Sequence, residues 1–113
     1  MIETRPWGNF TVLYSEDKCK VKKIIVLPGE RLSYQFHRKR SENWTIICGF
    51  AEFTLEDKII FLEAGNNIFI PLGFKHRVKN IGKENLEIIE VQYGEYLEED
   101  DIVRIKDDYN RAK

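Results

Sequence analysis

The sequence predicts an all-β protein, built as a sandwich or a small barrel. Runs of about four to eight β-forming residues recur about every 8 to 12 residues, with turn-forming residues between them. No segment before residue 97 has a convincing apolar period of 3.6 residues. A chain of 113 residues has the size of one ordinary domain, so we expect a single domain over residues 1–113.

The expected strands follow one another along the chain and are separated by short turns. They cover residues 10–14, 20–27, 44–48, 50–55, 58–62, 67–70, 76–80 and 86–93. Glu56 and Asp57 stand alone between two of these runs and predict a tight hairpin. The tail from residue 98 to residue 113 is highly charged, and it is compatible with a short helix, a strand or an extended arm.

Composition narrows the class of protein. Eighteen Lys and Arg against 19 Asp and Glu give a net charge of -1, which argues against general nucleic-acid binding by bulk charge. The first ten residues lack the apolar stretch of a signal peptide, and no apolar run approaches the ~20 residues of a membrane helix. Two cysteines do not make a disulfide framework. We therefore expect a cytoplasmic protein without a nucleic-acid or membrane partner.

Charge is distributed unevenly along the chain. Residues 18–40 contain eight Lys and Arg but a single acid, Glu30, whereas acidic residues dominate after residue 94. A basic run of this kind is either a solvated face or the mouth of a pocket that attracts a small anion such as phosphate. The sequence leaves both interpretations open.

The two histidines of the chain, His37 and His76, lie in windows that could hold a metal. If residues 33–39 form a strand, alternate side chains point to one face, namely those of Gln35, His37 and Lys39. Glu42 follows after a short turn and can swing back to that face. Imidazole nitrogen and carboxylate oxygen suit a divalent metal with one position left open. Taken alone, each histidine is more often an ordinary core or surface residue than a metal ligand.

Both windows resemble the two motifs of the cupin superfamily. The first motif is G, five residues, H-x-H, three or four residues, E, six residues, G. It is matched, with Gln in place of the first His, by Gly29, Gln35, His37, Glu42 and Gly49. The second motif is G, five residues, P-x-G, two residues, H, three residues, N. It is matched without a gap by Gly65, Pro71, Gly73, His76 and Asn80.

A closer resemblance is to the cupin domain of type II mannose-6-phosphate isomerases, from about residue 5 to residue 111. It rests on segments 5–8, 20–24, 28–30, 40–44, 71–73, 86–92 and 99–104, among others. In that family the domain often forms the C-terminal part of a bifunctional enzyme whose other part is a mannose-1-phosphate guanylyltransferase. That part is absent from this sequence, so the resemblance implies a stand-alone form.

The resemblance implies a fold and a reaction. The implied fold is the cupin double-stranded β-helix, a small antiparallel barrel or jelly roll with the metal inside. The implied reaction interconverts mannose 6-phosphate and fructose 6-phosphate by moving a proton between C1 and C2, in carbohydrate metabolism and nucleotide-sugar biosynthesis. The implied cofactor is a divalent metal, with zinc as the first choice and manganese, cobalt, iron or nickel as alternatives.

The resemblance also implies roles for individual residues. The implied metal ligands are Gln35, His37, Glu42 and His76. The implied catalytic residue is Arg104, at a position thought to serve catalysis or phosphate binding. Lys39 is a departure, since the family tends to have His there, and it is a catalytic candidate because a lysine buried in the cavity can act as a base or hold a phosphate. Further candidates for the substrate pocket are Lys22, Arg40, Arg77 and Trp7. Each of three residues also has an interpretation without a functional role: Arg104 as part of a surface ion pair, Lys39 as a solvated cation, and Trp7 as a core residue.

Two other functions stay open. One is a cupin that binds a sugar phosphate or nucleotide sugar without turnover, which Lys39 and Asn43 favour as departures from the family pattern. The other is a cupin enzyme of different chemistry, such as metal-dependent oxygenation. In the leading interpretation the partner is a small sugar phosphate. We also expect a homodimer, because an exposed edge strand needs covering.

Overall fold

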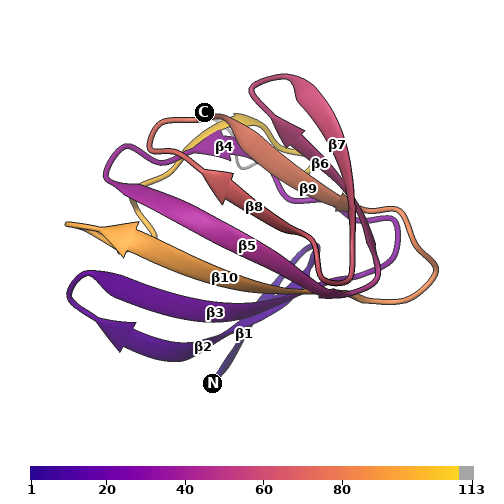
Figure 1. Cartoon of the computed structure of the whole chain (residues 1–113), viewed down its shortest axis with the longest axis horizontal. Helices are drawn as coiled ribbons and strands as arrows, with labels where there is room; N and C mark the ends of the chain where they lie inside the picture. Colours follow the sequence, from indigo (N-terminus) through magenta and orange to yellow (C-terminus); the bar gives the residue numbers. More distant parts are fainter. Residues whose placement is uncertain (110–113) are drawn as a thin grey trace.

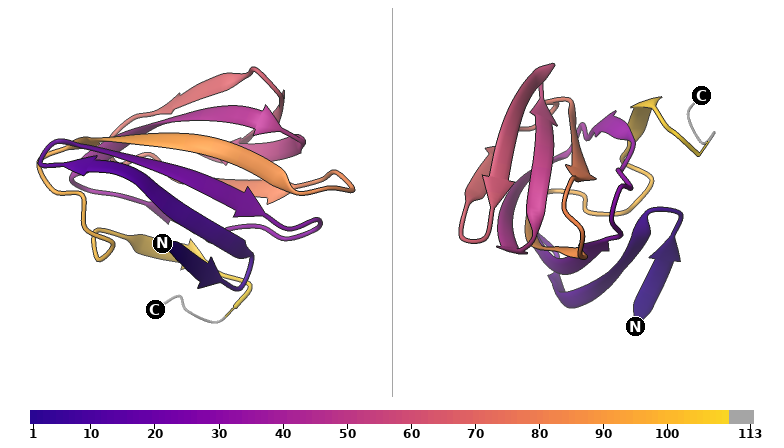
Figure 2. Two further views of the ribbon diagram at one scale, coloured as in Figure 1. Left: turned by 90° about the horizontal axis from the view of Figure 1, so that it is seen from below. Right: turned by 90° about the vertical axis from the view of Figure 1, so that its right-hand side faces the viewer.

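The computed structural model describes residues 1–109, which form eleven strands and no helix (Figure 1). Two antiparallel sheets face each other (Figure 2). The six-stranded sheet contains, in spatial order, β1 (Ile2–Arg5), β2 (Gly8–Glu16), β3 (Cys19–Val26), β10 (Leu86–Gly94), β5 (Arg40–Cys48) and β8 (Asn67–Ile70). The five-stranded sheet contains β11 (Val103–Lys106), β4 (Tyr34–Phe36), β9 (His76–Asn80), β6 (Phe50–Leu55) and β7 (Lys58–Glu63).

The predicted all-β antiparallel fold is confirmed, and most expected strands occur near their predicted bounds. Strands β6, β8 and β9 have the predicted bounds, whereas the anticipated strand over residues 33–39 is only the three-residue β4. The tail contributes the short strand β11, and its residues 110–113 lie outside the described part of the chain. Strand β1 has no counterpart among the expected strands, because its residues are mostly exposed and lack an apolar alternation.

The predicted hairpin between β6 and β7 is confirmed. Leu55 pairs with Lys58, so the loop has only two residues. Those residues, Glu56 and Asp57, have φ angles of 49° and 68°, as a type I′ turn requires. The Tyr34 hydroxyl donates to Asp57 Oδ1 at 2.6 Å and accepts from the Asp57 N–H at 2.9 Å, which ties the turn to β4.

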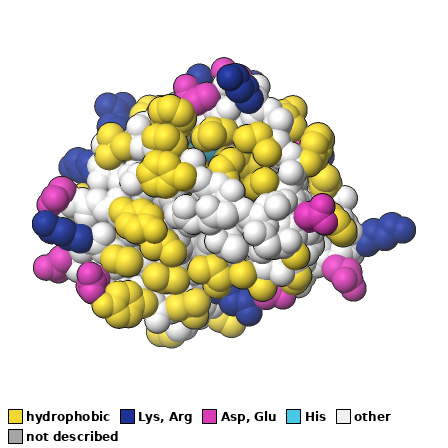
Figure 3. Space-filling view, viewed as in Figure 1, with side chains coloured by type: hydrophobic (Ala, Val, Ile, Leu, Met, Phe, Trp, Pro, Cys, Tyr) yellow, Lys and Arg dark blue, Asp and Glu magenta, His cyan; other side chains and the backbone are white. Residues whose placement is uncertain are grey.

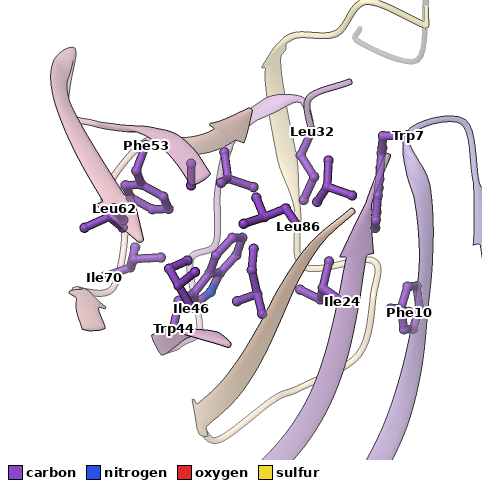
Figure 4. Close-up of a cluster of buried hydrophobic side chains, with 14 residues drawn as sticks. Trp7, Phe10, Ile24, Leu32, Trp44, Ile46, Phe53, Leu62, Ile70 and Leu86 are labelled. Atoms are coloured by element: carbon purple, nitrogen blue, oxygen red, sulfur yellow. The ribbon is translucent and has the colours of Figure 1, made fainter. Parts of the chain in front are cut away.

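The interior is apolar at one end and polar at the other. In β10 the inward side chains run from Leu86 and Ile88 to Glu90 and Gln92. The pairing of β10 with β5 sets Ile88 opposite Ile46 and Gln92 opposite Glu42, so the change from apolar to polar occurs at the same level in both strands. Figure 4 shows the apolar cluster, with Trp7 and Phe10 on one side and Phe53 and Leu62 on the other.

The outer face of the six-stranded sheet is poor in charge. In the view of Figure 3, apolar and uncharged side chains cover the centre, and charged side chains lie mostly at the periphery. Strands β1, β8, β11 and β7 are the sheet edges, and the homodimer through strand edges stays a prediction. Within residues 1–109, no helix is long and apolar enough to cross a membrane.

Gly8 lets two strands approach closely beside the buried Trp7. A Cβ added at Gly8 would lie 2.0 Å from the carbonyl oxygen of Ile25, on the neighbouring strand β3. We expect Gly8→Ala to lower the free energy of unfolding by about 3 kcal/mol, because the backbone has to separate to relieve the clash. Urea denaturation measures this change.

Gly82→Ala is the matched control. Its added Cβ would come no nearer than 3.4 Å to the Phe50 side chain, so we expect a change below about 1 kcal/mol. Equal midpoints for the two variants would contradict the close-approach explanation.

Candidate metal centre

Three buried side chains converge at the polar end of the interior. Glu42 comes from β5, His76 is the first residue of β9, and His37 lies in the turn after β4. One ligand atom from each of them lies within 4.8 Å of the others. Their side chains are at most 4% exposed. The three ligands predicted from the motif spacing are therefore brought together.

Both imidazoles are oriented by backbone carbonyls. His37 donates from Nδ1–H to the Asp101 carbonyl at 2.6 Å, and His76 donates from Nδ1–H to the Phe74 carbonyl at 3.0 Å. With Nδ1 protonated, each Nε2 keeps its lone pair and faces Glu42, at 3.3 Å for His37 and 3.6 Å for His76. Metal-binding histidines are typically held by this kind of hydrogen bond.

The electrostatics of this group favour a cation. Burial, followed by the positive charge of Arg40, lowers the pKa of His37 from 6.5 to about 3, and burial lowers the pKa of His76 to about 4. Both rings are thus neutral at pH 7, and two nitrogen lone pairs face carboxylate oxygens with no proton between them. The buried Gln92 Oε1, opposite Glu42 in the sheet, also has no hydrogen-bond partner. The donor set fits a divalent metal, which His37, Glu42 and His76 could hold.

The two sequence motifs are joined by backbone contacts around His37. The Gly73 N–H of the second motif donates to the His37 carbonyl at 2.9 Å. The Asp101 carboxylate accepts the N–H groups of Arg38 and Lys39, both at 2.9 Å, so it fixes the turn that presents His37. Asp101 was not identified from the sequence, because this contact joins segments more than 60 residues apart.

Arg40 is the cation nearest to the centre. Its Nε donates to Glu42 Oε2 at 2.7 Å, and its Nη2 lies 3.3 Å from His37 Nε2. Trp44 Nε1 donates to Glu42 Oε1 at 3.0 Å. Each carboxylate oxygen therefore keeps one lone pair for a metal, whereas a metal bound to His37 Nε2 requires Arg40 Nη2 to move away.

A pocket of about 70 Å³ adjoins this centre, and its walls include five of the residues predicted for the site: Gln35, Lys22, Arg40, Arg104 and Trp7. Arg104 of β11 pairs with Gln35 of β4, and Gln35 pairs with His76 of β9. Neighbouring side chains in such a row share one face of the sheet. Arg104 is thus about 10 Å, or two strand spacings, from the metal-binding group.

Glu90 is a pocket residue that was not identified from the sequence. Its side chain is 4% exposed, accepts a hydrogen bond from Gln92 Nε2 at 3.1 Å and lines the pocket. Burial, followed by the charge of Glu42, raises the pKa of Glu90 from 4.5 to about 8. The alternation of residues 86–93 could have located it, since Glu90 is in phase with the apolar Leu86 and Ile88.

Two predicted residues lie away from this pocket. The expected orientation of Lys39 into the cavity is wrong, because β4 ends at Phe36 and strand alternation stops there. Lys39 is exposed, and its ammonium lies 4.8 Å from the centre of the Tyr96 ring. Arg77 follows the inward-facing His76 in β9, and it lines a different pocket on the outer face of its sheet.

Comparison with known proteins identifies the family. A model of the family "Mannose-6-phosphate isomerase C-terminal" matches residues 2–107. The chain belongs to this family. Similar proteins include the xanthan biosynthesis protein XanB of Xanthomonas campestris pv. campestris (48% identical) and a mannose-1-phosphate guanylyltransferase of Escherichia coli K12 (46% identical). Each match covers 96% of this chain but only 23% of the relative, so the chain spans about a quarter of the length of these relatives.

Solved structures show the cupin double-stranded β-helix fold that the family membership implies. CapF, a capsular polysaccharide assembling protein of Staphylococcus aureus, superposes with a TM-score of 0.79 at 20% identity, over 94% of this chain and 31% of CapF. The Cnp3 cupin domain of Schizosaccharomyces pombe gives a TM-score of 0.74 at 18% identity, over 76% of this chain and 64% of that domain. The predicted cupin fold is confirmed.

Removal of one ligand of the centre tests its metal binding. We expect His76→Ala to weaken Zn²⁺ binding at least about 100-fold, because an inward-facing nitrogen ligand is lost. Competition with a chromophoric chelator measures the affinity. The surface variant Lys39→Ala should bind as wild type does. Unchanged affinity in His76→Ala would refute the ligand assignment, and weakened binding in Lys39→Ala would return Lys39 to the site.

Glu90 also makes the metal-free protein sensitive to alkaline pH. A carboxyl whose pKa is raised on folding favours the folded state in its protonated form, so stability falls as pH rises from 4.5 to about 8. We expect Glu90→Gln to stabilise the chelator-treated protein by about 1 to 3 kcal/mol at pH 9, and to change it little at pH 4.5. Denaturant unfolding at the two pH values measures this difference. An equal change in stability at pH 4.5 and pH 9 would contradict the raised pKa of Glu90.

Proposed function

We propose that this chain is a metal-dependent sugar-phosphate isomerase that interconverts mannose 6-phosphate and fructose 6-phosphate. Membership of the mannose-6-phosphate isomerase C-terminal family supports this function. The observation on which it chiefly rests is the row of Arg104, Gln35 and His76, which sets a cation about 10 Å, or two strand spacings, from the candidate metal ligands. A hexose 6-phosphate carries its phosphate at the end of the carbon chain opposite C1 and C2. It therefore needs a metal near C1 and C2 and, at a distance from the metal, a cation for the phosphate.

His37, Glu42 and His76 would hold the metal, with Gln35 Oε1 as a fourth ligand, and zinc is the proposed ion. Gln35 already donates its Nε2 hydrogens to Ser33, at 2.9 Å to Oγ, which turns the amide so that Oε1 remains for other contacts. When bound, the metal would supply electrophilic stabilisation of the sugar oxygens. The chain's own groups have to bind the sugar and move the proton.

Glu90 is the carboxyl proposed to carry the proton between C1 and C2. It is buried in the pocket wall, whereas the other pocket carboxylate, Glu99, is half exposed and bound to Lys22 Nζ at 2.7 Å. In its ionised form, a carboxyl shielded from water can accept a proton and return it without exchanging it freely with solvent.

Arg104 is proposed to bind the phosphate. Lys22 and Arg40 also line the pocket, where Lys22 Nζ lies 2.7 Å from Glu99 Oε2 and Arg40 Nε lies 2.7 Å from Glu42 Oε2. Trp7 is at once a core residue and part of the pocket wall, where it limits the depth of the site. Arg is well suited to a phosphate because its guanidinium can donate two parallel hydrogen bonds.

A second candidate function is a cupin that binds a sugar phosphate without turnover. The position of Arg40 favours it, because Arg40 Nη2 lies 3.3 Å from the nitrogen that a metal needs on His37.

An NMR assay that follows fructose 6-phosphate and mannose 6-phosphate directly separates these functions. We expect turnover only after Zn²⁺, Mn²⁺ or Co²⁺ is restored to chelator-treated protein, and none in Glu90→Gln, which keeps its metal. Arg104→Gln should raise KM about tenfold or more, because it loses a charge-assisted hydrogen bond to phosphate. Binding without turnover with every metal would support the second function.

A further inference from the structure

A second cationic pocket lies on the outer face of the five-stranded sheet, away from the metal-binding group. It has a volume of about 250 Å³. In β9 the inward side chains are His76, Val78 and Asn80, so the intervening Arg77 and Lys79 point outward and enter this pocket. Lys106 of β11 and Arg31, which forms an isolated bridge with Lys79, complete its cationic lining.

Arg77 is the buried charge at the base of this pocket. The residue is only 9% exposed, yet it forms no ion pair within residues 1–109. Its Nε donates to the Leu32 carbonyl at 3.1 Å, while its Nη2 is buried and has no hydrogen-bond partner among the described residues. Burial, followed by the charge of Arg31, lowers the pKa of Arg77, although the charges of Asp108 and Asp107 act in the opposite direction.

The acidic groups of the pocket are directed to other partners. Asp57 accepts from the Tyr34 hydroxyl at 2.6 Å and pairs with Lys75 at 3.5 Å. Glu52 is the second acid in the wall and lies opposite Lys79 in the sheet. Arg31 donates from Nε and Nη2 to the two carboxylate oxygens of Asp108, at 2.7 and 2.9 Å. With Arg31 paired to Asp108, the cations Arg77, Lys79 and Lys106 face the two lining acids Glu52 and Asp57, so the lining keeps a net positive charge.

We propose that this outer pocket binds the phosphate group of a small phosphorylated metabolite, at a site separate from the metal centre. A phosphate dianion can accept hydrogen bonds from Arg77 and Lys79 together, and it would supply the missing counter-charge. The volume of about 250 Å³ leaves room for an organic part beyond the phosphate. Thr54 and Tyr34 in the wall add neutral polar contacts for that part.

Chemical-shift mapping on the ¹⁵N-labelled full chain tests this proposal without reference to turnover. Inorganic phosphate and glycerol 3-phosphate are titrated separately at constant ionic strength. We expect saturable shifts at the amides of Tyr34, Thr54, Arg77 and Lys79, with tighter binding of the ester. Arg104→Gln should leave these shifts unchanged, because Arg104 lines the inner pocket.

Charge-removing variants locate the contact. Arg77→Gln should weaken binding at least tenfold, and Lys79→Gln about threefold. The Lys79→Gln variant is needed because Arg77 also donates a hydrogen bond to the Leu32 carbonyl, so Arg77→Gln removes a contact within the fold as well. Lys83→Gln removes an exposed positive charge outside the pocket and is the matched control. Shifts confined to inner-pocket residues, shifts that do not saturate, or equal affinity in Lys79→Gln and Lys83→Gln would each overturn the proposal.

Discussion

The buried carboxylate of Glu42 is the constraint around which the polar end of this barrel is organised. A carboxylate that is 1% exposed is stable only with strong partners. Arg40 and Trp44 each donate to one of its oxygens, and two imidazole nitrogens lie 3.3 and 3.6 Å from those oxygens. An apolar side chain in place of Glu42 would remove the carboxylate that accepts the hydrogen bonds of Arg40 and Trp44.

The apolar end of the interior allows this arrangement to persist. Strands β5 and β10 each contribute apolar side chains at one end and ionisable ones at the other, and their register keeps the two sets apart. Glu90 shows the energetic consequence, because burial beside Glu42 raises its pKa to about 8. A barrel selected for stability alone would carry an apolar residue there, so this acid indicates a functional requirement.

The sequence predicted the metal-binding group because each ligand lies at a fixed spacing from a glycine or a proline in its own motif. It failed for Lys39, because alternation was extended through residues 37–39, where the chain turns instead. Asp101 escaped prediction for a different reason, since it acts through contacts between distant segments. The position of Arg77 was predictable in principle: if His76 faces inward on a strand, its neighbour must face outward.

Arg40 links the metal-binding group to the adjacent pocket. Its Nη2 lies 3.3 Å from His37 Nε2, where a metal and a guanidinium cannot both fit, while its Nη1 is 3.7 Å from Glu99 Oε2 in the pocket wall. Movement of Arg40 away from His37 therefore brings its charge toward Glu99, which already binds Lys22. Lys22 and Arg40 then share one half-exposed carboxylate, so more of their positive charge is available to an incoming anion. We therefore expect the proposed metal site and the proposed phosphate pocket to be coupled through Arg40.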